Sequence, residues 1–263
     1  AQQGSDPDEG WTISENKGCR RRNVVASFVC IRYNRTGKAV RCRIYAGCGL
    51  MHAITKKTGR AFYENHLFGT FTSEGYAIIL DPYQDKSVPG YRPLREQADQ
   101  VLCSHEHQDH HGVDQVALHQ GGRSPFTIET ISTWHDDQQG ALRGPDTFHI
   151  LDDGQCRLAH LGDLGCELTA QQKERLKGLD ALLIPVGGFY TIDARQAKAL
   201  AEELEPRVVV PMHYRGNGFG YDVIGPVDAY TDLCADVVRY PGSDLELTAE
   251  TAKQTAVLTA RNR

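Results

Sequence analysis

Apolar residues fall into short runs between residues 76 and 161, separated by polar and turn-forming residues. Runs of this length, rich in β-branched and aromatic residues, are typical of β-strands. The run 76–80 enters a turn at Asp81-Pro82, and a shorter run at 100–103 leads directly into a group of histidines. Further strands are predicted at residues 126–133, 147–151 and 156–161.

From residue 169 the pattern changes to helices that alternate with buried strands. Thr169-x-x-Gln172 and Asp193-x-x-Gln196 have the form of capping boxes, which mark helix starts. After the second box, the apolar positions follow the helical i, i+3, i+4, i+7 spacing. The continuous apolar runs 181–185 and 208–210 are typical of buried strands. Strands followed by alternating strands and helices predict an α/β fold of the α+β type, with sheets covered by helices.

The first 50 residues differ from the rest of the chain. Residues 2–18 are polar, rich in turn formers and typical of disorder. The stretches 23–33 and 38–45 favour β-structure and could pair as a hairpin. We predict a partly disordered N-terminal extension over residues 1–50, peripheral to the main fold, and one domain over residues 52–263.

The charge distribution narrows the classes of partner. The net charge is −5; residues 1–50 hold nine Lys/Arg against four Asp/Glu, and the remainder holds 20 against 30. This acidic body argues against nucleic acid as a partner. No apolar run reaches the length of about 18 residues that a membrane span needs, and no secretory signal pattern opens the chain. We therefore expect a small-molecule partner, a cytoplasmic location and reduced cysteines, with homo-oligomerisation left open.

The segment with the clearest chemistry is the histidine group after the run 100–103. Where the backbone is extended, alternate side chains project to the same side, so His105 and His107 can bind one metal ion. The chain then turns, and Asp109 and His110 can bind a second ion nearby. Imidazole and carboxylate ligands suit zinc, iron or manganese, and the lack of a cysteine ligand disfavours a purely structural zinc site.

This His-x-His-x-Asp-His motif after a strand resembles the metallo-β-lactamase fold superfamily. The likeness extends through most of residues 65–247, and the branch it resembles most contains the ascorbate-6-phosphate lactonases. The further matching segments are Asn65-His66, residues 76–83, Trp134-His135-Asp136, Leu161-Gly162-Asp163 and Pro211-Met212-His213-Tyr214. The resemblance implies an αββα sandwich, two mixed β-sheets flanked by helices, with a binuclear metal site at one edge.

The resemblance also implies a ligand set and a mechanism. The first metal ion would be held by His105, His107 and His135, and the second by Asp109, His110 and His213, with Asp163 bridging the two. Zinc is the preferred ion, with manganese or iron as alternatives. A water molecule between two cations loses a proton near neutral pH, and the hydroxide could cleave a small-molecule ester, lactone or phosphoester. Asp109 and Asp163 are the expected catalytic residues, with Asp109 orienting the nucleophile or moving its proton.

Four residues are candidates for contact with the substrate. Arg143 and Arg215 could neutralise an anionic substrate, because guanidinium pairs with phosphate or carboxylate. Tyr190 could donate a hydrogen bond to an oxyanion or merely pack, and the resemblance places His66 near the site. His119, His149 and His160 are expected to be ordinary surface or core residues.

Three other functions stay open on the sequence. A metal-dependent oxidoreductase on the same fold is disfavoured, because di-iron relatives usually carry Glu where this chain has His107. A nuclease is disfavoured by the acidic body and by the lack of a nucleic-acid-binding domain. A binding protein with an inactive site is disfavoured because every expected ligand position holds a competent residue.

Overall fold

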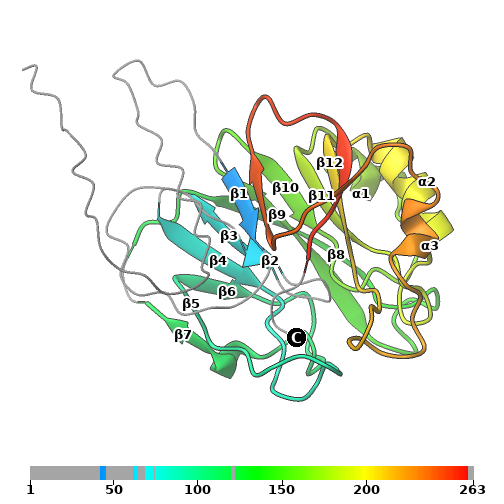
Figure 1. Ribbon diagram of the computed structural model, residues 1–263, viewed down its shortest axis with the longest axis horizontal. Coiled ribbons are helices and arrows are strands. Elements are labelled where there is room, and N and C mark those ends of the chain that lie inside the picture. Colours follow the sequence, from blue (N-terminus) through cyan, green and yellow to red (C-terminus); the bar gives the residue numbers. More distant parts are fainter. Residues whose placement is uncertain (1–41, 46–61, 64–68, 74, 120–121, 260–263) are drawn as a thin grey trace, which may run out of the picture. The chain divides into compact units, whose positions relative to one another are not determined.

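Two β-sheets form the fold, and a hydrophobic core lies between them (Figure 1). The computed structural model describes residues 42–45, 62–63, 69–73, 75–119 and 122–259. In the core, Phe71 and Ile78 of one sheet pack with Leu151 and Leu183 of the other. Burial of such apolar side chains is the main force that holds the two sheets together.

The first sheet has the strand order β14–β1–β3–β4–β6, and β2 pairs with β3. Its neighbouring strands run antiparallel except β4 and β6, which run parallel. The strands are β1 (Cys42–Tyr45), β2 (Phe62–Tyr63), β3 (Gly69–Ser73), β4 (Tyr76–Leu80), β6 (Gln100–Leu102) and β14 (Asp244–Leu247).

The second sheet has the order β13–β15–β12–β11–β10–β9–β8. Strands β8 and β10 are each antiparallel to β9, which lies between them, and the pairs β10–β11, β11–β12, β12–β15 and β15–β13 are parallel. The strands are β8 (Thr127–Trp134), β9 (Pro145–Asp152), β10 (Arg157–His160), β11 (Ala181–Pro185), β12 (Val208–Met212), β13 (Val237–Arg239) and β15 (Gln254–Val257). Both sheets are therefore mixed, as predicted.

Helices cover the outer face of the second sheet (Figure 1). They are α1 (Ala170–Arg175), α2 (Ala194–Leu204) and α3 (Asp228–Thr231). Both predicted capping boxes are present, on Thr169 and Asp193. In α2 the buried residues are those of the predicted apolar stripe, Ala197, Leu200, Ala201 and Leu204. None of the helices in the described part of the chain has the length and apolar character of a membrane span.

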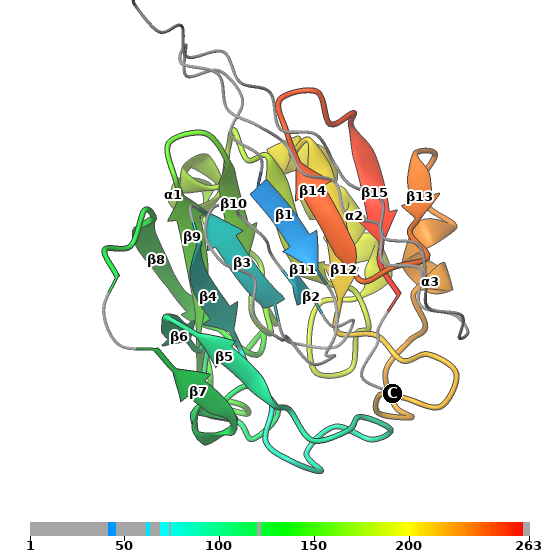
Figure 2. The same ribbon diagram turned by 60° about the vertical axis from the view of Figure 1, so that its left-hand side comes forward.

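A small third sheet packs on the outer face of the first one. Strands β5 (Glu96–Ala98) and β7 (Val116–Leu118) run parallel to each other and lie side by side in Figure 2. Ala98 and Val116 from this pair are buried with Ile79 of β4. A 3-10 turn, η1 (Val113–Gln115), precedes β7. Over the described residues, this pair and the adjacent loops cover the face of the first sheet.

The structure corrects one expectation about the N-terminal extension. Strand β1 lies within the segment 1–50, yet it pairs with β3 on one side and β14 on the other. These four residues are therefore part of the first sheet and not peripheral to it. The other expectations for this extension, including the partner strand at residues 23–33, lie outside the described residues.

Candidate metal centre

The direction of the strands explains why distant residues meet at one place. Strands β8 and β10 run the same way because both are antiparallel to β9. Strands β11 and β12 are parallel to β10, so the carboxyl ends of all four strands lie at the same edge of the second sheet. In sequence, the segments that carry His135, Asp163 and His213 follow β8, β10 and β12. The first sheet adds the loop after β6, which holds the histidine motif.

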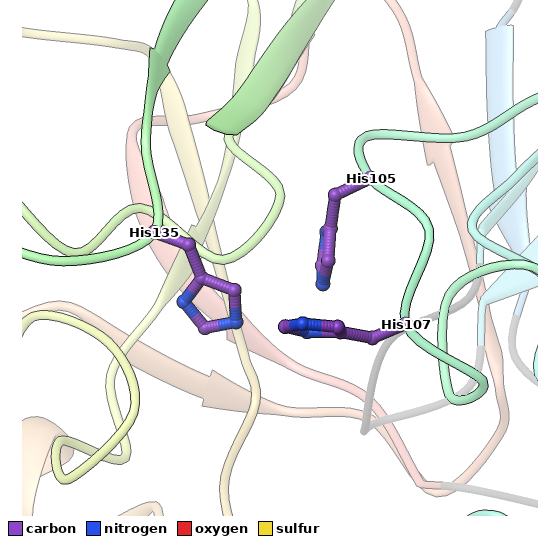
Figure 3. A group of neighbouring side chains, drawn as sticks. All are labelled: His105, His107 and His135. Carbon is purple, nitrogen blue, oxygen red and sulfur yellow. The ribbon is translucent and has the colours of Figure 1, made fainter. Parts of the chain in front are cut away.

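Three histidines form the first candidate metal site. His105, His107 and His135 each offer a ring nitrogen, and these atoms lie within 4.8 Å of one another. Figure 3 shows the three rings converging, with His105 and His107 on one loop and His135 on another. His105 and His135 are buried, whereas His107 is exposed. Three imidazoles around a space open to solvent are typical of catalytic zinc sites, which keep a position free for water or substrate.

A second candidate site adjoins the first and is built around Asp163. His105, His110 and Asp163 also place ligand atoms within 4.8 Å of one another. Asp163 Oδ1 lies 3.2 Å from His110 Nε2, and Asp163 Oδ2 lies 3.1 Å from His135 Nε2 and 3.2 Å from His213 Nε2. One carboxylate thus faces histidines of both expected ligand sets.

Asp109 completes the set on the side open to solvent. Its Oδ2 is 4.0 Å from His110 Nε2, and its side chain is 17% exposed. The structure therefore brings together all of the ligand positions expected from the sequence: His105, His107, Asp109, His110, His135, Asp163 and His213.

The hydrogen bonds around this cluster determine which nitrogens face it. The Ser104 hydroxyl donates its only proton to Asp81 Oδ2 at 2.6 Å, so it accepts a hydrogen bond from His105 Nδ1 at 2.8 Å. His110 Nδ1 donates to Asp81 Oδ2 at 2.9 Å. Both rings are thereby fixed with Nε2 toward the cluster.

The surroundings of the Nε2 atoms of His105 and His110 are typical of metal ligands and unusual for buried histidines that bind no metal. His105 Nε2 is buried and has no hydrogen-bond partner among the described residues, while buried His110 Nε2 faces Asp163 Oδ1 at 3.2 Å. Buried polar atoms are normally paired, and an unpaired imidazole nitrogen whose other nitrogen is held by a carboxylate or hydroxyl is typical of metal ligands. The donor set of imidazoles and carboxylates suits zinc, manganese or iron.

The electrostatics of the metal-free cluster show the charge that a cation would balance. Burial by itself would raise the pKa of Asp163, but the charges of His110 and His213 and a hydrogen bond from His110 hold it well below its ordinary range. Burial would lower the pKa of His110, yet the charges of Asp163 and Asp109 raise it well above its ordinary value. Because protons on histidine balance Asp163 in the absence of metal, metal binding must release protons.

Asp81 is a functional residue that the sequence reasoning missed. It follows β4, is fully buried, and accepts hydrogen bonds from the Ser104 amide at 2.6 Å, from the Ser104 hydroxyl and from His110. Burial would raise its pKa, but the hydrogen bond and charge of His110 bring the pKa well below its ordinary value. An aspartate directly after an apolar strand is a pattern that could indicate a site residue, but the Asp81-Pro82 pair by itself predicts only a turn.

Asp146 is a second missed residue, at the start of β9. It is fully buried, with Oδ1 3.5 Å from His105 Nδ1 and 3.3 Å from the Asp163 amide nitrogen. Gly162 makes this approach possible: a Cβ there would lie 2.3 Å from Asp146 Oδ1 and 2.7 Å from Ser104 Cβ, and the residue has φ +46°. The Leu161-Gly162-Asp163 motif therefore needs glycine for steric reasons as well as conformational ones.

Asp136 organises the loop after His135. Its carboxylate accepts hydrogen bonds from the amides of Gln138, Gly140, Leu142 and Arg143 at 2.8–3.0 Å. Burial would raise the pKa of Asp136, and these backbone bonds lower it below its ordinary value. The loop that carries Arg143 is thus fixed to the residue next to His135.

Two of the expected substrate contacts meet at the rim of the cluster. The Arg143 guanidinium lies 5.6 Å from the centre of the Tyr190 ring, and its Nη2 donates to the Phe189 carbonyl oxygen at 3.3 Å. The Tyr190 ring is 6.4 Å from that of His213. Arg215 is exposed and uses its Nε to hold the Ile224 carbonyl oxygen at 2.8 Å. His66 lies outside the described residues.

Tyr221 was not among the expected site residues. Its hydroxyl lies 3.1 Å from Asp109 Oδ2 and 2.7 Å from the Ser87 carbonyl oxygen, so it can donate to either. Burial, followed by the charge of Asp109, raises the pKa of Tyr221 and keeps the hydroxyl protonated. No local sequence motif marked this residue, because its contact with Asp109 depends on two loops that meet only in the fold.

The remaining histidines take the places expected of them. His160 is fully buried, accepts a hydrogen bond from the Gly162 amide at 3.2 Å, and has a pKa lowered to about 4 by burial. His149 contacts the Cys103 carbonyl oxygen at 3.0 Å, and His119 contacts exposed Gln97 at 3.1 Å. His160 Nδ1 also lies 3.9 Å from Asp81 Oδ2, so it packs directly behind the residue that orients His110.

Comparison with known proteins agrees with this fold. A family model for the β-lactamase superfamily domain matches residues 63–213. A relative from Carboxydothermus hydrogenoformans, named a UPF0173 metal-dependent hydrolase, is 29% identical over 178 aligned residues that cover 54% of this chain and 78% of that protein. A relative of the same name from Thermococcus kodakarensis is 27% identical and covers 65% of this chain and 92% of that protein.

A solved structure supports the same assignment. A crystal structure from Thermotoga maritima, of a protein assigned to the Zn-dependent hydrolases of the metallo-β-lactamase superfamily, has 28% sequence identity and a TM-score of 0.60. The match covers 84% of this chain and 100% of that chain. The chain therefore belongs to the β-lactamase superfamily, has the metallo-β-lactamase fold, and is a metal-dependent hydrolase.

Proposed function

We propose that this enzyme uses two divalent metal ions, preferably zinc, to hydrolyse a small-molecule ester, lactone or phosphoester. The observation that carries the proposal is the position of Asp163. Its two oxygens lie 3.1–3.2 Å from nitrogens of His110, His135 and His213, which belong to both ligand sets. A buried carboxylate at that position would balance positive charge on metal ions held by these histidines.

The chemistry divides between the metal ions and the protein. Two divalent ions held by these residues would supply Lewis-acid chemistry, making a water molecule more acidic and compensating negative charge on the substrate oxygen. Asp109 is the residue placed to accept a proton, because it is partly exposed and lies beside His110. Tyr221 orients the Asp109 carboxylate from the other side.

The rim residues suit an anionic substrate. Arg143 lies over Tyr190 beside His213, so its charge is close to the cluster without being a ligand. Arg215 contributes a further positive charge from the loop after β12, although its Nε already donates a hydrogen bond to the Ile224 carbonyl oxygen. We propose that these arginines bind a carboxylate or phosphate of the substrate. The ascorbate-6-phosphate lactonase-like branch supplies candidate substrates of this kind, and nucleic acid is not proposed as a partner.

The experiment is a hydrolysis screen with zinc-loaded protein, followed by substitution of Asp163. The panel contains lactones, carboxylic esters, phosphomonoesters and phosphodiesters. On any substrate that is turned over, Asp163→Asn should lower kcat by about 100-fold or more, comparable to the loss of a major electrostatic contribution. Asp232→Asn removes the same charge from an exposed position directly after α3 and should leave kcat unchanged.

Two results would count against this proposal. Equal kcat values for the two variants would show that Asp163 does not act on the metal pair. In protein purified without added zinc, a visible absorption band of bound iron together with substrate oxidation, and no hydrolysis in the screen, would identify a metal-dependent oxidoreductase on this fold instead.

A further inference from the structure

Phe189, next to the metal cluster, has an unusual conformation for a large apolar residue. Its side chain is 62% exposed and its backbone has φ +62°. A bulky residue rarely adopts this left-handed conformation, and such strain persists only where surrounding contacts hold it, often at functional sites. Exposure of the ring removes the usual gain from burying it. Both costs together indicate that the ring has a role outside the folded core.

The backbone contacts of this loop fix Phe189 relative to the metal ligands. Arg143 Nη2 donates to the Phe189 carbonyl oxygen at 3.3 Å. Gly187 packs so closely on the His213 carbonyl oxygen that a Cβ there would lie 2.1 Å from it. The Gly187 carbonyl oxygen also accepts a hydrogen bond from the Gly225 amide at 2.7 Å. The loop is therefore held between the loop after β8 and the loop after β12, both of which carry cluster histidines.

Aromatic contacts connect the exposed ring to the cluster. The Phe189 ring is 4.8 Å from the Tyr190 ring at an interplanar angle of 86°, and the Tyr190 ring is 6.4 Å from that of His213. We call Phe189 and Tyr190 the aromatic shelf. Leu142, the residue before Arg143 in the loop after β8, is also 61% exposed. Two aromatic rings thus lead outward from His213 to the exposed Phe189.

Exposed apolar residues are common on proteins and usually need no explanation. Leu118 on β7 is 54% exposed and is such a residue, because its sheet contributes nothing to the cluster. Phe189 differs because its backbone is strained and its carbonyl oxygen accepts a hydrogen bond from Arg143. Its ring also contacts Tyr190, whose ring in turn lies near that of His213. We propose that the aromatic shelf binds an apolar alkyl, acyl or aryl group of the substrate. This inference rests on the proposed hydrolase function and narrows the substrate to molecules with such a group.

Binding of straight-chain carboxylates to zinc-loaded protein tests the inference without requiring turnover. Calorimetric titration with acetate, butanoate, hexanoate and octanoate keeps the carboxylate constant while the chain grows. Burial of each CH₂ group favours binding, so octanoate should bind about tenfold or more tightly than acetate. Phe189→Asn should flatten this dependence on chain length, while Phe189→Leu should retain most of it.

The choice of asparagine separates recognition from structure. Asparagine tolerates a left-handed backbone, so Phe189→Asn should have an unchanged or higher Tm although it loses the chain-length dependence. Leu118→Ala is the control and should behave like the wild type in binding. Equal affinity of the wild type for all four carboxylates, or an unchanged chain-length dependence in Phe189→Asn, would overturn the inference.

The test also separates this inference from the proposed function. If the affinity for carboxylates rises with chain length in the wild type but not in Phe189→Asn, the aromatic shelf is supported even when the screen finds no hydrolysis. In that case only the hydrolase proposal fails. Hydrolysis of small polar lactones with no chain-length dependence of binding overturns the shelf and leaves the hydrolase proposal standing.

Discussion

At the scale of single residues, the site depends on side chains that do not face the cluster at all. Asp81 fixes the His110 ring directly and the His105 ring through the Ser104 hydroxyl. Partners of this kind set the tautomer and orientation of a ligand, and their loss weakens metal binding even though they never touch the ion. Asp81 is thus the residue outside the ligand set whose substitution should be most informative.

We predict that Asp81→Asn weakens metal binding by about 10–100-fold, the range typical for such partners. The amide keeps the shape of the side chain but carries no negative charge. Only its oxygen, and not its NH₂ group, can accept the hydrogen bonds that Ser104 and His110 donate to Asp81. Competition titration with a zinc-binding dye gives the affinity. Asp85→Asn is the control, since Asp85 pairs with exposed Arg95 and lies four residues away. Similar zinc affinity in both variants would show that Asp81 does not orient the ligands.

The sequence predicted the ligand positions but not the residues that contact and orient the ligands, and the reason is physical. His105, His107, Asp109 and His110 lie together in one short motif after a strand, so local spacing reveals them. Asp81 and Asp146 reach the cluster only because β4 lies beside β6, and because β9 starts at the edge where β8 and β10 end. Such contacts depend on strand pairing between distant segments, which a local pattern does not show.

At the scale of elements, long periodic segments were predictable, and of the three-residue strands among the described residues only β6 was. The capping boxes on Thr169 and Asp193, and the buried strands β11 and β12, lie where the sequence placed them. Strands β5, β7 and β13 have three residues each, and their pairing partners are distant or equally short. Three residues carry too little alternation to distinguish a strand from a loop.

The prediction from sequence and the structure differ most at strand β1. The sequence alone predicts that residues 1–50 are peripheral to the main fold, whereas the structure places β1 between β3 and β14. We predict that deletion of residues 1–50 lowers Tm and promotes aggregation, because it leaves strand edges on β3 and β14 unpaired. Thermal unfolding and light scattering measure both effects.

Deletion of residues 1–38 is the matched control, since it keeps β1 in the chain. A lower Tm for the longer deletion than for the shorter one is the expected result. The same Tm for both would mean that β1 contributes no stability to the sheet.

At the scale of the whole molecule, the cluster joins parts of the chain that are far apart in sequence. The histidine motif follows a strand of the first sheet, and His135, Asp163 and His213 follow strands of the second. An ion that binds residues from both sheets binds the folded state only, and it therefore stabilises the fold as a whole. Thermal unfolding should accordingly report metal binding.

This stabilisation should depend on pH in a defined direction. The raised pKa of His110 stabilises the metal-free fold at pH values below the ordinary histidine value of about 6.5, and that contribution is lost as the pH rises through the folded pKa. The lowered pKa of Asp163 stabilises the fold above the ordinary aspartate range and is lost only at acid pH. Metal ions compete with the proton on His110, so their binding strengthens as pH rises.

We therefore predict that zinc raises Tm more at pH 8 than at pH 6. Scanning calorimetry of metal-free and zinc-loaded protein at both pH values gives the two shifts. His119→Gln, a substitution at an exposed histidine, should retain the difference. A zinc-induced shift that is equal at both pH values would argue against proton release from His110.

The central claim is that these residues hold two metal ions with Asp163 between them, and metal stoichiometry tests it most directly. Elemental analysis of the purified zinc-loaded protein should give two ions per chain, and anomalous diffraction should place them about 3.5–4 Å apart, the usual separation in two-metal hydrolases. Asp163→Asn should reduce the content toward one ion. One ion or none in the wild type, or two ions in both proteins, would contradict this account of the site.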